Sequence, residues 1–307
     1  MRLMQHKKEA YWFYRFLSIF YDELVNPLFW TEPMRDKALR IAGLENLDSD
    51  DKVIDVGSGT GFTTEGIVNY VDSAQVTCID QSPHQMAHAK RKAKLQGAKF
   101  HLGDAESLPV TTNSYDAYVS AGSIEYWPHP GQGVREAYRV IKPGARATII
   151  GPIEPPTAWG RFLANTWMLF PKEVEYMQWY QQAGFEDVRI EYCDPAWYTG
   201  DRHFALAISG RKPLKGPPEA PAIVEERDTE AYGLAASAKT VGRVILGSAA
   251  GGAFIPMALG AKAIAAVQGR DDGSEPLTTA QKGVLLGLGV AAAVGVGAWL
   301  SRRSDER

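Results

Sequence analysis

A carboxylate beside a glycine-rich turn is the part of the chain best suited to binding chemistry. Asp55 precedes a turn that consists of Gly57, Ser58, Gly59, Thr60 and Gly61. Glycine lacks a Cβ, so this backbone can bend sharply and come close to a ligand. The β-branched run before the turn predicts a buried strand, and residues 62–68 after it predict a helix whose free N–H groups face the turn. Together these features predict a nucleotide-type binding site.

Asp55 indicates which nucleotide the site holds. A dinucleotide would place its pyrophosphate at this turn, where the carboxylate would repel it. S-adenosylmethionine has no phosphate and carries two cationic groups, an ammonium and a sulfonium. Asp55 therefore favours S-adenosylmethionine as the cofactor, with S-adenosylhomocysteine as its product. The alternative is a glycine-rich turn that shapes the backbone and binds no ligand.

Further candidate cofactor ligands follow the other predicted strands. They are Asp80, Gln81, Asp104, Ala105, Ser120 and Ala121. Asp80 lies about 20 residues after the turn, where a ribose-binding carboxylate belongs. Asp104 and Ala105 are placed to contact the adenine, although Asp after a glycine is also a common turn residue. Ser120 and Ala121 are expected to approach the methionyl part.

Strand and helix patterns alternate along the chain and bring these residues to one place. Apolar runs predict strands at 53–56, 76–79, 99–102, 115–120, 145–150, 188–193 and 204–209. Helices are predicted at 34–43, 62–68, 83–96, 131–141, 157–170 and 172–183. Repeated βα units predict an α/β fold, a parallel sheet with helices on both faces. Ligands of such sheets bind at the carboxyl ends of the strands, where the loops meet.

Bulk composition narrows the class of protein. The 307 residues carry a net charge of -3, so no basic excess points to nucleic acid. The two cysteines, Cys78 and Cys193, lie far apart and lack the spacing of a disulfide framework or a zinc site, so no metal is expected. Residues 1–9 contain no apolar core of a signal peptide.

The segments on either side of the sheet region differ from it in composition. Seven of the eleven residues from Tyr11 to Tyr21 are aromatic. Residues 1–50 are therefore expected to form a helical lid over an apolar substrate, or else a helix packed on the domain. Residues 51–212 are expected to form the catalytic domain. A Pro-rich, polar linker is expected at 213–238.

The last part of the chain, residues 239–307, reads as a hydrophobic membrane-anchor tail. Residues 244–261 and 283–300 contain no charged side chain, and each reaches the lower end of the roughly 17–25 residues that a span requires. Small residues at every fourth position would let two helices approach closely in a bilayer. A helical hairpin is expected, against the alternative of a soluble or surface-lying pair. Flanking cations put the catalytic domain and the C-terminus on the stromal or cytoplasmic side.

Several motifs now resemble a known family. Residues 55–61, 103–109 and 139–144 resemble class I S-adenosylmethionine-dependent methyltransferases. Residues 6–18, 80–85, 119–128 and 167–173 are similar to the 2-methyl-6-phytylbenzoquinol and 2-methyl-6-solanesylbenzoquinol methyltransferases of chloroplast envelopes. The resemblance covers about residues 6–212. It departs at His129, where plant members have Asp, and in the tail, where plant members have one span.

The resemblance implies a substrate, a pathway and a location. It implies C-methylation of a prenylated benzoquinol on the way to plastoquinone and tocopherols (vitamin E). It also implies a site at the chloroplast inner envelope membrane, with the catalytic domain on the stromal side, or on the cytoplasmic side if the source is a cyanobacterium. Its partners are then the quinol and the lipid bilayer, not a nucleic acid.

A base beside the quinol hydroxyl would help the reaction, because loss of that proton concentrates negative charge on the ring carbon ortho to it. The candidates near the strand ends are Glu125, His129 and His203, with Tyr126 as an orienting donor. His203 is the favoured base. Glu125 could instead bind the ammonium of the cofactor, and either histidine could simply lie on the surface.

Other functions stay open on the same residues. One is a class I methyltransferase that acts on a different lipophilic quinone or a sterol. Another is a nicotinamide-dependent oxidoreductase, which Asp55 and the position of the third glycine, Gly61, disfavour. A membrane-tethered binding protein without catalysis is the last, although the intact acidic residues argue against it.

Overall fold

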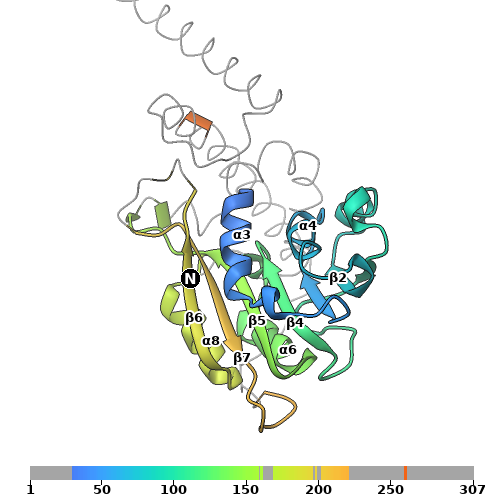
Figure 1. The fold of residues 1–307 in the computed structure, drawn as a ribbon. Coiled ribbons are helices and arrows are strands. Elements are labelled where there is room, and N and C mark those ends of the chain that lie inside the picture. Colours follow the sequence, from blue (N-terminus) through green and yellow to red (C-terminus); the bar gives the residue numbers. More distant parts are fainter. Residues whose placement is uncertain are drawn as a thin grey trace, which may run out of the picture.

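The computed structural model describes residues 30–158, 160–161, 169–195, 198, 202–220 and 259–260. Within them, seven strands form one sheet in the order β3-β2-β1-β4-β5-β7-β6 (Figure 1). The strands are β1 Val53–Val56, β2 Val76–Asp80, β3 Lys99–Leu102, β4 Tyr115–Ala121, β5 Ile141–Pro152, β6 Glu186–Cys193 and β7 Ala205–Arg211. The predicted α/β fold is confirmed.

One strand departs from the parallel sheet that the sequence predicted. β7 runs antiparallel to both of its neighbours, β5 and β6, whereas the other pairs are parallel. Parallel neighbours need a crossover of a dozen or more residues, usually a helix. β6 and β7 are joined directly by residues 194–204, in whose described part no helix occurs. The short connection therefore reverses the chain and makes the sheet mixed.

Helices cover both faces of the sheet, as predicted. They are α3 Glu32–Ile41, α4 Phe62–Ile67, α5 Pro83–Ala89, α6 Pro130–Val140 and α8 Glu173–Ala183. Short 3-10 helices are η2 Leu44–Asn46, η3 Ser73–Gln75, η4 Ala93–Leu95 and η5 Ile124–Tyr126. The predicted helix 83–96 ends early, because the chain leaves the α-helix at Lys90 and re-forms one turn as η4. Most of the predicted helix 157–170 lies outside the described residues.

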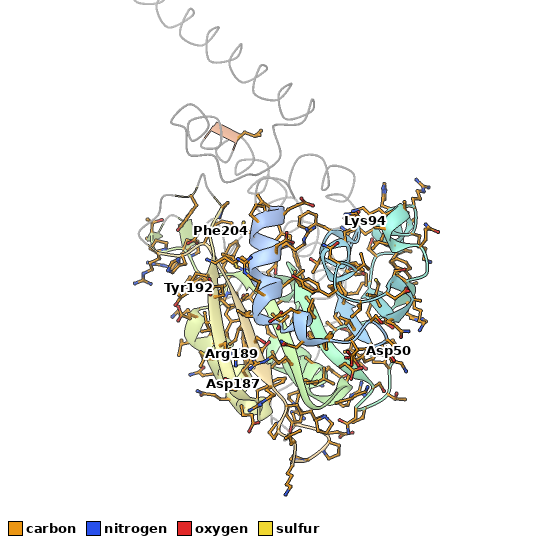
Figure 2. The ribbon with its side chains drawn as sticks, in the orientation of Figure 1. Asp50, Lys94, Asp187, Arg189, Tyr192 and Phe204 are labelled. Atoms are coloured by element: carbon orange, nitrogen blue, oxygen red, sulfur yellow. The ribbon has the colours of Figure 1, made fainter. Side chains whose placement is uncertain are left out.

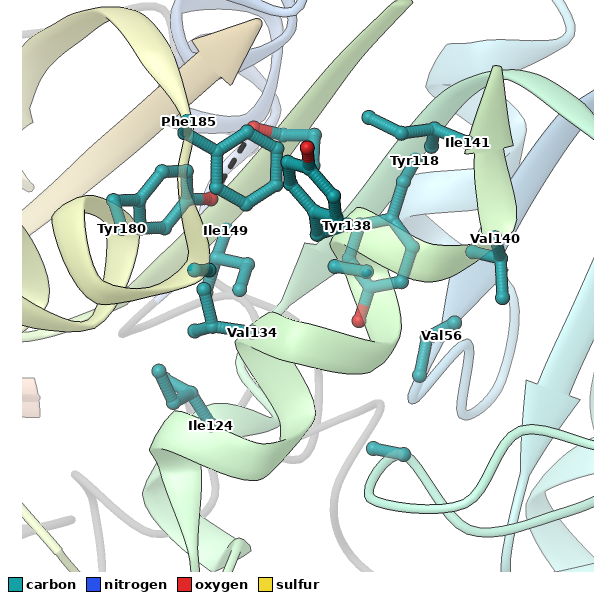
Figure 3. Close-up of a cluster of buried hydrophobic side chains, with 14 of the residues drawn as sticks. Val56, Tyr118, Ile124, Val134, Tyr138, Val140, Ile141, Ile149, Tyr180 and Phe185 are labelled. Atoms are coloured by element: carbon teal, nitrogen blue, oxygen red, sulfur yellow. Dashed lines mark hydrogen bonds between the residues drawn. The ribbon is translucent and has the colours of Figure 1, made fainter. Parts of the chain in front are cut away.

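Alternation along the strands divides the core into two layers. Successive side chains of a strand point to opposite faces. Val53 faces the layer that contains α3 and part of α4, whereas Ile54 and Val56 face the layer that contains α6 and α8. Figure 3 shows the second layer, where Tyr118, Tyr180 and neighbouring aliphatic side chains pack around α6.

Residues 30–50 pack on the sheet as part of the same domain and do not form a separate cap. The buried face of α3 packs in the same cluster as β1 and β2. Arg35 is buried, donates to the carbonyl of Phe62 over 3.2 Å and lies over its ring. The guanidinium thus ties α3 to the start of α4, next to the glycine turn. The lid prediction for the aromatic segment 11–21 lies outside the described residues.

The first part of the predicted linker also packs on the domain. Lys212 is buried, and its ammonium donates to the carbonyl of Pro218 over 2.8 Å. Tyr138 donates its hydroxyl to the carbonyl of Pro217, and Ala220 is buried against the same layer. Residues 213–220 are therefore a strap across α6, so the packed domain extends beyond the predicted boundary at 212.

In the described part of the chain, no helix is both long and apolar enough to cross a membrane. The two stretches for which spans were predicted, 244–261 and 283–300, lie outside that part apart from residues 259–260. The predicted anchor therefore stays a prediction.

Candidate functional site

The glycine turn folds from the end of β1 onto the end of β2. The backbone N–H groups of Gly57 and Ser58 both donate to the carbonyl of Ile79, over 2.7 and 3.1 Å. Gly57, Gly59 and Gly61 all have positive φ, at 72°, 54° and 86°. L-residues with side chains rarely adopt such values, so this turn requires glycine at each of the three positions.

Each of these glycines also lets another part of the protein come close. A Cβ on Gly57 would lie 2.2 Å from Oγ of Ser123, in the loop after β4. One on Gly59 would lie 2.9 Å from Oε1 of Gln85 on α5. The sequence explained the glycines by close approach of a ligand. In the structure they first bring the walls of the site together, and contact of the glycines with a ligand stays a prediction.

Asp55 is wholly buried and only half satisfied. Its Oδ2 accepts a 2.6 Å hydrogen bond from the hydroxyl of Thr64 on α4, whereas its Oδ1 has no hydrogen-bond partner. Burial raises the pKa of the carboxyl to about 7, and the nearby charge of Asp80 adds to the rise. A cation beside Oδ1 would stabilise the ionised form and reverse that shift.

Asp80 fastens the turn from the neighbouring strand. Its Oδ2 accepts the N–H of Gly59 over 2.8 Å, and its Oδ1 accepts the N–H of Ser82 over 2.7 Å. Burial raises the pKa of this carboxyl, while the N–H donors, including that of Gln81, act in the opposite direction. A carboxylate oxygen can accept more than one hydrogen bond, so the predicted contact with a ribose remains compatible with this geometry. The Gln81 side chain itself is exposed.

The loop after β3 lies beside Asp80, as predicted. The N–H of Gly103 donates to the Asp80 carbonyl over 3.0 Å. Oδ1 of Asp104 accepts the N–H of Glu106 over 3.0 Å, which is the turn role that the sequence offered as the alternative. Ala105 is buried in the core. A contact of Asp104 or Ala105 with adenine stays a prediction.

Among the buried polar atoms without a hydrogen-bond partner in the described residues, five belong to residues at or just after the carboxyl ends of β1, β2 and β4. They are Asp55 Oδ1, Ser58 Oγ, Gln85 Nε2, Ser120 Oγ and Glu125 Oε2. Leaving a buried polar group unpaired costs about 1–3 kcal/mol, so such a concentration calls for a ligand. Two carboxyl oxygens suit cations, and the amide and hydroxyls suit a ligand carboxylate and ribose. This set fits S-adenosylmethionine.

Glu125 belongs to this group and the other candidates near it do not. It lies in η5, directly after β4, and burial raises the pKa of its carboxyl to about 8. His129 instead starts α6, where its backbone N–H donates to Oε1 of Glu106 over 2.6 Å. Tyr126 is half-buried in η5. Ala121, the last residue of β4, is half-buried next to the fully buried Ser120.

His203 lies elsewhere along the same edge of the sheet. It precedes β7, is 48% exposed, and its Nδ1 lies 2.6 Å from Oδ2 of Asp194. Its ring stacks on Tyr192 at 3.8 Å between centroids. The structure therefore separates the predicted catalytic residues: Glu125 lies among the unpaired atoms, and His203 lies beyond β5, in the connection between β6 and β7.

The sequence did not identify three residues that contribute to the site or to the pairing of His203. Thr64 and Gln85 were each interpreted as part of a helix, yet Thr64 donates to Asp55 and Gln85 lies against Gly59. Asp194 follows β6 and pairs with His203. Helix spacing did not reveal them, although Thr64 and Gln85 both lie in the first turns of helices that start at the carboxyl edge, where ligands of such sheets bind.

Comparisons with known proteins decide the family. The methyltransferase domain family matches residues 54–149. The 2-methyl-6-phytyl-1,4-hydroquinone methyltransferase 1, chloroplastic, of Oryza sativa subsp. japonica is 54% identical over 229 residues, which cover 71% of this chain and 69% of the rice protein. The 2-methyl-6-phytyl-1,4-hydroquinone methyltransferase, chloroplastic, of Arabidopsis thaliana is 53% identical over 233 residues, which cover 75% of this chain and 68% of the Arabidopsis protein. This chain belongs to their family.

The fold comparison agrees with this assignment. A SAM-dependent methyltransferase from Thermotoga maritima superposes with a TM-score of 0.51 at 17% identity, over 67% of this chain and all of the other. The likeness shows the shared fold. As a member of the phytylhydroquinone methyltransferase family, the chain is an S-adenosylmethionine-dependent methyltransferase.

Proposed function

We propose that this chain methylates a ring carbon of a prenylated benzoquinol, 2-methyl-6-phytyl- or 2-methyl-6-solanesyl-benzoquinol, in tocopherol and plastoquinone biosynthesis. The observation that carries the proposal is the identity of 54% with the rice phytylhydroquinone methyltransferase over 229 residues. That stretch is long enough to include the whole seven-stranded sheet, so it supports a common acceptor as well as a common donor.

Two buried carboxyls hold the donor in this proposal. Asp55 lies on β1 and Glu125 follows the neighbouring strand β4 in η5, and each has one unpaired oxygen. Asp55 and Glu125 are thus the candidates for the cationic ammonium, Asp80 and Gln81 for the ribose, and Asp104 and Ala105 for the adenine. The glycine turn with Ser58, and Ser120 with Ala121, complete the cradle. Glu125 then acts in binding, which leaves proton transfer to another residue.

Positioning does most of the work, because the bound S-adenosylmethionine supplies a methyl group that its sulfonium already activates. The protein has to place a quinol ring carbon in line with that methyl group and keep water out. A phenol has a pKa near 10, so a base beside the hydroxyl raises the fraction of the reactive phenolate. His203 is the proposed base. His129, which precedes α6 and donates its backbone N–H to Glu106, and Tyr126, which is half-buried in η5, are the weaker candidates.

We also propose a location and a domain organisation. The relatives are chloroplastic by name, which supports a chloroplast location. The uncharged stretches 244–261 and 283–300 support a tail that anchors the protein to the inner envelope membrane, with the catalytic domain on the stromal side. The aromatic segment 11–21 of the predicted N-terminal lid, 1–50, would cover an apolar substrate. Carbonate extraction of membranes that carry the full chain, or a chain that ends at residue 220, tests the anchor.

The test of the activity supplies labelled S-adenosylmethionine with either quinol and identifies the methylated carbon. The proposal expects one new methyl group, on the carbon ortho to a free hydroxyl. S-adenosylhomocysteine binding is measured in parallel by calorimetry. If the product binds but neither quinol is methylated, the acceptor is wrong and the donor site stands. If S-adenosylhomocysteine does not bind at all, the assignment of the donor residues is wrong.

A further inference from the structure

The connection between β6 and β7 contains a carboxylate–imidazole pair with defined geometry. Oδ2 of Asp194 lies 2.6 Å from Nδ1 of His203. Its other oxygen, Oδ1, accepts the N–H of Phe204 over 2.6 Å. The backbone therefore fixes the carboxylate, and the carboxylate fixes one nitrogen of the ring. A carboxylate accepts hydrogen bonds, so it selects the tautomer with the proton on Nδ1 and leaves a lone pair on Nε2.

A second contact fixes the plane of the same ring. The ring of Tyr192, on β6, stacks on that of His203 at 3.8 Å with an angle of 10° between the planes. Tyr192 is itself anchored, since its hydroxyl donates to Glu173 on α8 over 3.0 Å. Three neighbouring elements, β6, α8 and the turn before β7, thus hold one partly exposed imidazole in one orientation.

The pair lies at the carboxyl edge of the sheet, where ligands of such sheets bind. Ala205, the first residue of β7, pairs with Pro152 and Cys193, the last residues of β5 and β6. Its neighbour His203 is thus at the carboxyl end of the strands. Figure 2 shows Tyr192 and Phe204 nearer to this end, and Asp187 and Arg189 at the opposite one. Only β5 separates β7 from β4, so the strands that carry His203 and Ser120 are about 10 Å apart.

We propose that Asp194 is a positioning residue that, with Tyr192, holds His203 with Nε2 ready to take the proton of the quinol hydroxyl. The inference rests on the proposed function and specifies its base. An exposed surface histidine would not need a carboxylate held by the backbone and a stacked ring held from α8.

The proton balance of the step is complete. The hydroxyl proton moves to Nε2 of His203, and the oxygen's electron pair is delocalised onto the ortho carbon. That carbon bonds to the methyl group as the sulfur–methyl bond breaks and its electron pair stays on sulfur. The ring carbon then loses its own hydrogen as a proton to water, and the oxygen regains a proton from the imidazolium. The net products are methylated quinol, a neutral thioether and one proton.

Asp194→Asn separates positioning from structure. The amide oxygen can still accept the N–H of Phe204, but the amide nitrogen donates to Nδ1 and forces the proton onto Nε2. The turn keeps its hydrogen bonds and the base loses its lone pair. General-base catalysis contributes about 10²–10⁴-fold, so kcat should fall by about 100-fold or more with KM and S-adenosylhomocysteine affinity within about twofold. Asp194→Glu, which can still accept from Nδ1, should recover part of the loss.

A direct readout of the ring does not depend on turnover. In protein labelled with 15N-histidine, the signal that disappears in His203→Gln should show the Nδ1–H tautomer in the wild type and the Nε2–H tautomer in Asp194→Asn. The double variant Asp194→Asn/His203→Gln should be no slower than His203→Gln alone, because both changes remove one function. His101→Ala is the matched control, since His101 is exposed on the edge strand β3 and should leave kcat unchanged.

The pH profile gives the third readout. Groups packed around His203 are Asp194 and Tyr192, with Glu173 from α8, and Lys37 of α3, which donates to the Tyr192 carbonyl and pairs with Glu191. In His203→Gln, which lacks the proposed base, the rise of kcat with pH should follow the pKa of the phenol, near 10, and should differ from the rise in the wild type.

Two results would overturn the inference. One is an Asp194→Asn variant whose kcat stays within twofold of the wild type. The other is an Nε2–H tautomer in the wild type. Failure of the proposed function looks different, because the wild type itself would then methylate neither quinol while the tautomer of His203 would still be as described.

Discussion

The buried polar groups at the carboxyl ends of β1, β2 and β4 differ from the tyrosine hydroxyls under α8. Around the ends of β1, β2 and β4, Asp55, Gln85 and Glu125 each retain one buried polar atom without a partner. Under α8, where β5 meets β7, the tyrosine hydroxyls are paired. Tyr176 donates to the carbonyl of Pro152 over 3.0 Å, and Tyr180 donates to those of Ala147 and Ile208 over 3.2 and 3.0 Å.

This difference separates binding from packing. A paired buried group contributes stability, whereas an unpaired one costs stability until a ligand supplies the partner. The donor half of the sheet therefore gains its full stability only with ligand bound, and the packing half has it from folding alone. Substitutions in the two halves should then move different measurements, stability in one and affinity in the other.

The largest effect is expected at Lys212, which joins the packing half to the strap 213–220. Its buried ammonium donates to oxygens of Asn113, Tyr138, Ile141 and Pro218 over 2.7–3.1 Å. Lys212→Met removes the ammonium and leaves these oxygens without their donor. It should lower the free energy of unfolding by about 3 kcal/mol, without changing the affinity for S-adenosylhomocysteine. Urea denaturation and calorimetry check both.

The exposed Lys215 in the same strap gives the control, since Lys215→Met should change stability by less than about 0.5 kcal/mol. A loss of affinity in Lys212→Met at a temperature where it is folded would show that the two halves are not separate.

Asp55→Asn should instead raise the stability of the ligand-free protein and lower its affinity for S-adenosylhomocysteine. The pKa of this carboxyl is about 7 when folded against an ordinary 3.8, so the folded state binds its proton more tightly than the unfolded state. Its stability contribution therefore falls as pH rises from about 4 to 7 and is most unfavourable above 7. At pH 8 the uncharged amide should raise the free energy of unfolding of the ligand-free protein by roughly 2 kcal/mol.

The same change should weaken S-adenosylhomocysteine binding by about 100-fold, because the partner of the ammonium loses its charge. Thermal unfolding with and without ligand measures both effects, and the exposed Asp50 provides Asp50→Asn as a control that should alter neither. A variant that is less stable and still binds would remove Asp55 from the site.

The sequence predicted one of these halves better than the other, for a physical reason. The donor half depends on a local pattern, because Asp55, the glycines and Asp80 occupy strand ends and turns with strong backbone requirements. The packing half depends on contacts between distant residues. Asn113 and Lys212 meet across 99 positions, and no periodicity indicates that they do.

The same distinction explains the individual errors. β7 was expected to run parallel because apolar runs carry no direction, and only the short 194–204 connection decides it. Thr64 and Gln85 were hidden because helix periodicity describes a face and not the element that the face meets. Asp194 was missed because its role exists only after β6 and β7 pair and bring it to His203.

Tyr180→Phe should lower the free energy of unfolding by about 1 kcal/mol, since it removes one buried hydroxyl that serves two sheet carbonyls. S-adenosylhomocysteine affinity and kcat should stay as in the wild type, as measured by calorimetry and by the methylation assay. The exposed Val174 on the same helix offers Val174→Ala as the control with little effect on stability. Reduced ligand affinity in Tyr180→Phe would contradict the division into two halves.

The pH dependence of affinity sharpens the comparison from the ligand's side. Asp55, with a pKa of about 7, and Glu125, with a pKa of about 8, are partly protonated in the ligand-free protein near neutrality. The cationic ammonium of S-adenosylhomocysteine pairs with the ionised forms, so binding should release on the order of one proton at pH 7, and affinity should rise with pH. From pH 6 to 8 the increase should be about 100-fold, because each proton released raises the affinity about tenfold per pH unit.

Calorimetry in two buffers of different ionisation enthalpy gives the proton release directly. Asp55→Asn should retain only the part that Glu125 contributes, and Glu125→Gln only the part that Asp55 contributes. Tyr180→Phe, from the packing half, should release as many protons as the wild type, because its hydroxyl is paired whether or not the donor is bound. Binding without proton release in the wild type would mean that neither carboxyl meets the ammonium, and the unpaired oxygens of the donor half would then need a different ligand group.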